Sequence, residues 1–64
     1  MEQQMCEIVQ EVFYDLQAEL GDDLDAECLA DTIGDRMIDE SAEYRALSYA
    51  QRRTLALRVA QQYA

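Results

Sequence analysis

Acidic side chains recur every four residues in two rows, and their carboxylates are the most regular chemical feature of this chain. The rows consist of Glu7, Glu11, Asp15 and Glu19, followed by Glu27, Asp31, Asp35 and Asp39. If both segments are helical, like charges four residues apart repel by a few tenths of a kcal/mol per pair. Because this spacing lowers stability, the rows are candidates for a binding surface.

Carboxylates in such rows can present negative charge to a partner at a regular spacing. Successive acids rise about 6 Å along a helix axis, which is not far from the separation of neighbouring phosphates on one nucleic-acid strand. Two rows on adjacent helices can therefore imitate a phosphate backbone and occupy the basic groove of a nucleic-acid-binding protein. Solvated helices usually alternate acids with Lys or Arg, yet the first segment has no base. The alternative is that the rows are ordinary solvated faces, which charge rows most often are.

Tyr14 is the ninth residue of the candidate partner-binding set. On a helical wheel it falls outside the apolar band of its segment, between Gln10 and Gln17. An exposed tyrosine commonly anchors a protein interface, although an incidental surface aromatic is an equal alternative.

The stretch GDDLDAE resembles the start of a calcium-binding loop, with acids at alternate positions. An EF-hand loop starting at Asp23 requires glycine at its sixth position and a bidentate glutamate at its twelfth. Those positions hold Cys28 and Gly34. We therefore expect no metal site.

Catalytic chemistry is poorly supported by the residues present. Cys6 and Cys28 are the only cysteines, and the chain has no histidine, so it lacks both a zinc ligand set and the usual base for a nucleophilic thiol. A chain this short also has little room for an enclosed cleft. We expect no catalytic residues, no cofactor and no enzyme activity.

Charge is divided unevenly along the 64 residues, which we treat as a single small acidic domain spanning 1–64. Residues 1–43 contain all 14 acids against one arginine, a formal charge of −13, and the remainder carries four arginines and no acid, a charge of +4. The net charge of −9 opposes direct contact with nucleic acid or anionic membrane. A basic protein partner is favoured. No leader or apolar run of about 18 residues is present, so we expect a cytoplasmic protein.

The composition predicts an all-α fold, because the chain lacks proline and is rich in good helix formers. Apolar spacing places a first helix at 4–20, with Gly21 just past its end. The acids of this helix drift by about 40° per step, so Glu19 reaches the edge of the apolar band. Asp25 suits an N-cap for a second helix that ends near 39–40, and Gly34 inside it marks a close helix crossing.

The remaining elements complete a compact bundle of three main helices with a short extra helical turn before the last. Ser41 opens that turn, which runs to Leu47. Ser48 and Gln51 form a capping-box pattern for a last helix at 49–63.

Arginines in this last helix support a competing function, a small helical DNA-binding regulator that reads DNA with Arg52, Arg53 and Arg58. Arg52, however, falls within the apolar face, and Arg53 lies next to Leu57. We prefer that these arginines neutralise acids within the fold or across a dimer.

Apolar periodicity also predicts the core. Its members are Val9, Val12, Phe13, Leu16, Leu20, Leu29, Ile33, Met37, Leu55, Val59 and Tyr63. Truncating Phe13 to alanine at the centre of this core would cost about 3–5 kcal/mol. Ile38 and Leu57 fall outside the stripes, and burying them in a symmetric homodimer is the commonest solution for a small domain.

The sequence thus predicts a non-enzymatic protein–protein interaction module that inhibits a nucleic-acid-binding protein by mimicking nucleic acid. In size and charge it is similar to small acidic helical proteins found among phage-encoded inhibitors of host defence and among antitoxins.

Overall fold

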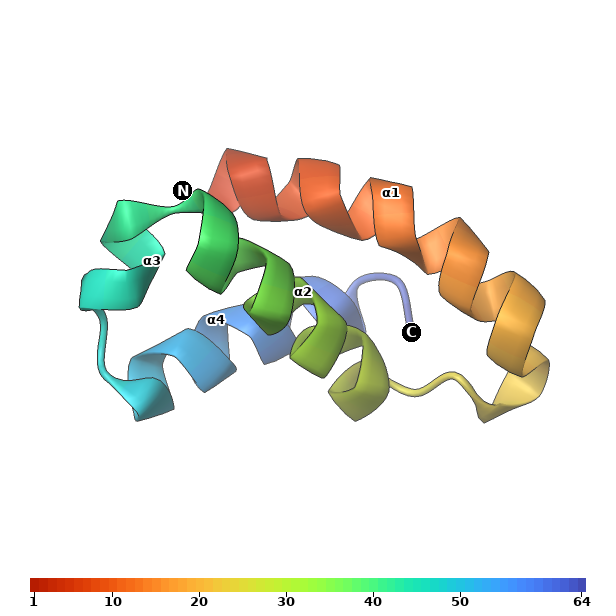
Figure 1. Ribbon diagram of the computed structural model, residues 1–64. Coiled ribbons are helices and arrows are strands. Elements are labelled where there is room, and N and C mark those ends of the chain that lie inside the picture. Colours follow the sequence, from red (N-terminus) through yellow and green to blue (C-terminus); the bar gives the residue numbers. More distant parts are fainter.

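Three main helices and one short helix make up most of the computed structural model, which describes residues 1–64 (Figure 1). The elements are α1 (Glu2–Leu20), the 3-10 turn η1 (Gly21–Asp23), α2 (Ala26–Glu40), α3 (Ala42–Ala46) and α4 (Tyr49–Gln61). This order confirms the predicted all-α fold with a short helical element before the last helix.

Capping residues explain where the helices begin and end. The Asp25 carboxylate accepts a hydrogen bond from the Cys28 backbone N–H at 2.8 Å and so starts α2. The predicted capping box of α4 is confirmed by reciprocal bonds between Ser48 and Gln51 at 3.1 and 3.2 Å. Gly21 ends α1 with a φ of 57° and a ψ of −126°, a backbone conformation that side chains disfavour.

Two predicted helix ends differ by two residues. The first helix starts at Glu2 because the Met5 N–H already bonds to the Met1 carbonyl at 3.1 Å. The last helix ends at Gln61 because the Tyr63 N–H bonds to the Ala60 carbonyl, three residues back, which tightens the final turn.

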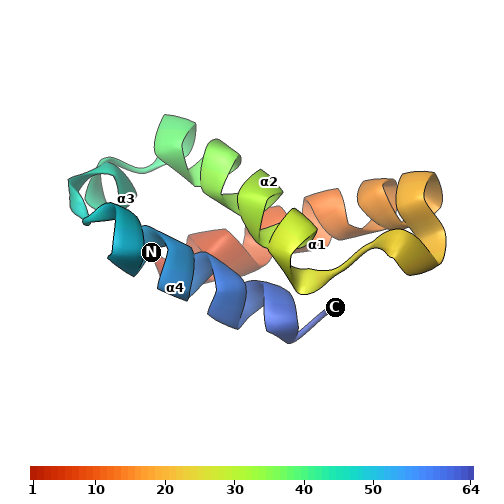
Figure 2. The same ribbon diagram turned by 90° about the horizontal axis from the view of Figure 1, so that it is seen from below.

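The central position belongs to α2, which packs against α4 on one side and α1 on the other (Figures 1 and 2). Its direction opposes that of α1, since Gln4 near the start of α1 donates to the Glu40 carbonyl at the end of α2 at 3.3 Å. None of the helices has both the length and the apolar character that a membrane span requires.

The core lies between the first half of α1, α2 and α4. Its buried side chains are Met5, Ile8, Val9, Val12, Leu29, Ala30, Ile33, Met37, Tyr44, Ala56, Val59 and Ala60. Six of the predicted core residues are thereby confirmed. These are Val9, Val12, Leu29, Ile33, Met37 and Val59.

The other five core predictions are not among the fully buried side chains. Those in α1 lie where this helix projects beyond the helices that cover it (Figure 1). Leu20 is 37% exposed. The remaining four are only partly buried, and they are Phe13, Leu16, Leu55 and Tyr63. Ile38 and Leu57, which we expected outside the core, are partly buried against it in the same way.

Gly34 accommodates a side chain rather than a helix crossing. A Cβ at this position would lie 3.3 Å from the Tyr44 hydroxyl oxygen, so the predicted close approach comes from α3. Tyr44 is 2% exposed, and its hydroxyl donates to the Arg52 carbonyl at 3.1 Å. The Ser41 hydroxyl caps α3 by accepting from the Tyr44 N–H at 3.1 Å. Tyr44 thus fixes the short helix against α2 and α4.

Candidate partner-binding surface

All eight carboxylates of the predicted rows are exposed on two adjacent helices, α1 and α2. The rows wind around their helices because residues four apart are displaced by about 40°. Their neighbours therefore change along each row, and the acids divide into those that meet an arginine of the fold and those that do not.

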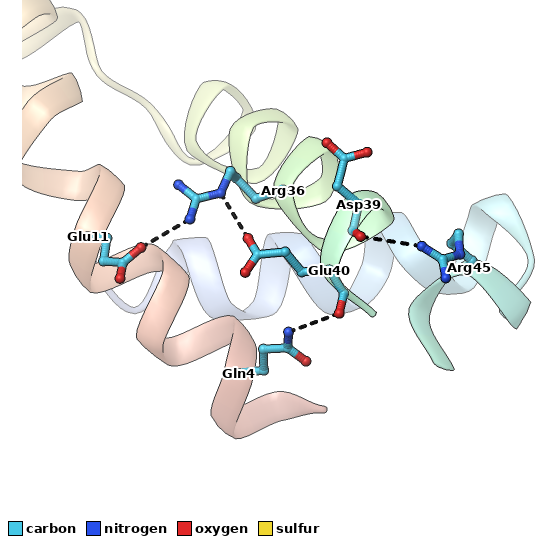
Figure 3. Close-up of polar contacts among 6 residues, drawn as sticks. All are labelled: Gln4, Glu11, Arg36, Asp39, Glu40 and Arg45. Carbon is cyan, nitrogen blue, oxygen red and sulfur yellow. Dashed lines mark hydrogen bonds and ion pairs between the residues drawn. The ribbon is translucent and has the colours of Figure 1, made fainter. Parts of the chain in front are cut away.

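Arg36 of α2 bridges to the first row. Its Nη2 donates to the Glu11 carboxylate at 3.1 Å and its Nε donates to the Glu40 carboxylate at 3.0 Å (Figure 3). The hydrogen bond from Glu40 and then that from Glu11 raise the pKa of the Arg36 guanidinium. Glu11 thus has a cation partner within the fold, which it shares with Glu40.

Arg53 of α4 reaches the second row in the same way. Its Nη1 donates to the Asp31 carboxylate at 3.1 Å, and this hydrogen bond is the main cause that raises the pKa of Arg53. Arg58 of α4 completes the set with a 3.2 Å contact to Glu2 of α1. Each pair of main helices is therefore joined by one exposed ion pair.

The other two arginines bind backbone carbonyls. Arg45 donates to the carbonyls of Ile38 at 2.7 Å and Asp39 at 3.4 Å, in the last turn of α2 (Figure 3). Arg52 donates to the Leu47 carbonyl at 3.0 Å and to the Arg45 carbonyl at 3.4 Å. Carbonyls at helix ends lack partners within the helix, so both arginines stabilise helix C-termini.

Six acids of the rows have no ion-pair partner in the fold. They are Glu7, Asp15, Glu19, Glu27, Asp35 and Asp39. In Figure 3 the Asp39 carboxylate points away from Arg36 and Glu11. The sequence showed which acids are exposed, but not that Arg36 and Arg53 would neutralise Glu11 and Asp31.

Tyr14 is 72% exposed, as its place outside the apolar band predicted. Its ring packs edge-on against Phe13 with centroids 5.8 Å apart. Gln10, Phe13, Tyr14 and Tyr63 line a surface pocket of about 310 Å³. Tyr14 is therefore part of an aromatic group, which the sequence alone did not reveal because Tyr63 comes from the far end of the chain.

No three side chains of His, Cys, Asp or Glu converge as metal ligands would, and Cys6 and Cys28 are free thiols. Two further surface pockets have volumes of about 160 Å³, between α2 and α4, and about 360 Å³, beside α4. The exposed carboxylates with Tyr14 remain the candidate site.

No family model, curated protein or solved structure matches the chain. The case for a function accordingly rests on the geometry and charge of this surface.

Proposed function

We propose that the protein is a cytoplasmic, non-enzymatic interaction module whose acidic helical surface binds a basic, nucleic-acid-binding partner protein. The carboxylates occupy the groove in which the partner holds nucleic acid and so inhibit it. One observation carries the proposal: six row carboxylates lack a cation, while all five arginines of the chain are engaged elsewhere in the fold. Uncompensated charge of one sign destabilises a folded chain and attracts oppositely charged partners.

The competing DNA-binding function has less support. Its three arginines are held by partners within the fold, Arg52 by carbonyls and the other two by carboxylates of α1 and α2. If these arginines contacted phosphates, their present interactions would have to break. The neighbouring acidic surface, which is negatively charged like DNA, would also repel the duplex. We therefore favour a protein partner.

Charge neutralisation at unpaired acids tests the proposal. Proteins captured from a lysate by the immobilised chain are identified and purified, and their affinity is measured for the double variant Asp15→Asn with Asp35→Asn. Asparagine keeps the shape of aspartate and removes its charge, so we expect affinity to fall at least about tenfold. Glu43→Gln is the matched control, because Glu43 is exposed and unpaired but lies in α3 outside the rows.

Two further outcomes belong to this experiment. Affinity should fall as the salt concentration rises and the screening length shrinks to about 8 Å, and duplex DNA should displace the protein from its partner. A partner that binds the double variant as tightly as the control, or that holds DNA and this protein together, would contradict nucleic-acid mimicry.

Homodimerisation remains a prediction. We expected it because the core of so small a domain is thin and because Ile38 and Leu57 fall outside the apolar stripes; both side chains are partly buried against the core, which weakens the second reason. The large apolar side chains that remain exposed are Met1, Tyr14, Leu20 and Tyr49. Light scattering at high micromolar concentration would decide between a monomer and a dimer.

A further inference from the structure

The C-terminal half of α1 extends past the body of the molecule and leads into η1 (Figures 1 and 2). No residue of α1 after Val12 is fully buried. The 19 residues of α1 exceed the 15 of α2 and the 13 of α4, so the shorter helices cannot cover its whole length. We call residues 13–23 the overhang.

An apolar face runs along the overhang. Phe13, Leu16 and Leu20 fall within about 60° of one another around the helix. Leu20 is 37% exposed, and the Tyr63 ring packs against Phe13 in a tilted arrangement with ring centroids 5.7 Å apart. The pocket of about 310 Å³ beside Tyr14 lies at the edge of this face. An anchor side chain from another molecule therefore has both an apolar stripe and a hollow to contact.

The charge of the overhang is entirely negative. It carries Asp15, Glu19, Asp22 and Asp23, and none of these carboxylates has an ion-pair partner. No arginine lies within the overhang, and the three arginines that bind carboxylates do so in the body of the molecule. An occupant of the apolar face would meet this negative charge at close range.

That charge argues against a second copy of the chain as the occupant. A symmetric dimer across the overhang would bring the same uncompensated acids of both copies together, and juxtaposed like charges cost several kcal/mol. A cationic occupant would instead be attracted by the same carboxylates that repel a second copy.

We propose that the overhang binds a cationic amphipathic segment of the partner. Apolar side chains of that segment pack on Phe13, Leu16 and Leu20, and its Lys or Arg residues pair with the four carboxylates. Helical segments bind grooves of this kind through anchors on one face, and an aromatic side chain such as Tyr14 commonly supplies much of the binding energy. The inference rests on the proposed function and adds an apolar anchor to a surface otherwise described by charge.

Two synthetic helical peptides of equal charge test the anchor, one of Leu and Lys with amphipathic spacing and one with Gln replacing Leu. Calorimetric titration of the wild-type protein should show the Leu peptide binding at least about tenfold more tightly. Amide shift changes measured by NMR should centre on residues 13–23 and Tyr63. Tyr14→Ala and Leu20→Ala should each narrow the difference between the peptides, and together they should narrow it further, with Phe13 and Leu16 accounting for what remains.

Tyr49→Ala is the matched control, because Tyr49 is 71% exposed on α4 and Tyr14 is 72% exposed on α1. It should leave both affinities unchanged. Thermal melts of all variants establish that they remain folded, which is expected for residues on the surface.

The alternatives give different results. Equal wild-type affinity for both peptides would overturn the apolar anchor and leave the charge-based function standing. If the protein bound neither peptide, the result would count against both the apolar anchor and the charge-based function. Amide shift changes centred outside the overhang and Tyr63, or a difference between the peptides that the double variant leaves as large as in the wild type, would also overturn the inference. A free protein that is dimeric and becomes monomeric with Leu20→Ala would show that a second copy occupies the face.

Discussion

Tyr44 shows how much one side chain determines in a domain this small. It is buried, its hydroxyl oxygen lies beside Gly34, and the same hydroxyl donates to the Arg52 carbonyl. The sequence pattern did not identify it, because α3 has only 5 residues and offers no periodic stripe from which to recognise a buried face. The sequence predicted a close approach at Gly34, but it could not show that Tyr44 is the residue that approaches.

The contact between these two residues predicts a non-additive pair of substitutions. Gly34→Ala gains up to about 1 kcal/mol of helix propensity, but its Cβ would meet the Tyr44 hydroxyl at 3.3 Å. Tyr44→Phe removes that hydroxyl and should cost about 0.5–1.5 kcal/mol through the lost hydrogen bond. We expect Gly34→Ala to be more stabilising in the Tyr44→Phe background than in the wild type. Additive effects in urea unfolding of the four proteins would contradict the close contact.

Alkaline pH should destabilise the protein through the same tyrosine. Burial, as the main cause, raises the pKa of Tyr44 above its ordinary value of 10.0. The folded state therefore holds the proton more tightly than the unfolded state, and this contribution is complete below about pH 10 and lost as the pH rises through the folded pKa. The free energy of unfolding of the wild type should fall there more steeply than that of Tyr44→Phe. If the free energy of unfolding changed with pH in parallel for the two proteins, Tyr44 would not contribute to the loss of stability at alkaline pH.

At the scale of elements, the sequence predicted helix boundaries better than helix coverage. Caps are local, so Asp25 and Ser48 could be recognised from neighbouring residues. How far along α1 the core extends depends on the lengths and positions of α2 and α4, which no local pattern contains. The wheel placed Val9 and Val12 on the buried face of α1, missed Ile8, and could not show that the second half of the helix is only partly covered.

This partial coverage changes the expected cost of truncating Phe13. The sequence placed Phe13 at the centre of the core, whereas it is only partly buried and packs on Tyr63. We now expect Phe13→Ala to cost about 1–2 kcal/mol, and Met5→Ala, at a residue with 0% exposure, to cost about 2–5 kcal/mol. Chemical denaturation of both variants measures which substitution lowers the free energy of unfolding more. A larger loss for Phe13→Ala would place the centre of the core further along α1.

Charge is the property that must be judged over the whole molecule. The net charge is −9, and the three main helices are joined pairwise by three exposed ion pairs. Exposed pairs contribute little individually, so repulsion among the unpaired acids should outweigh them. The sequence predicted exposure of the candidate site, since the acids lie outside the apolar stripes of both helices, and Glu19 lies at the edge of one. It could not predict pairing, because Arg36 and Arg53 reach their acids only once the helices pack.

Asp31 and Asp35 of α2 allow these opposing effects to be separated. They lie one turn apart in the same row and are both exposed, but only Asp31 has a cation, Arg53, at 3.1 Å. Asp35→Asn should raise the free energy of unfolding by a few tenths of a kcal/mol, because it relieves repulsion from acids four residues away. Asp31→Asn should raise the free energy of unfolding by less, or lower it, because it also breaks the bond to Arg53.

Urea, which is uncharged, is the denaturant for this comparison. Added salt should stabilise the wild type and reduce the difference between the two variants as screening increases. Equal shifts for both variants at low salt would mean that the Arg53 pair has no effect on stability, and a wild type destabilised by salt would mean that the ion pairs outweigh the repulsion.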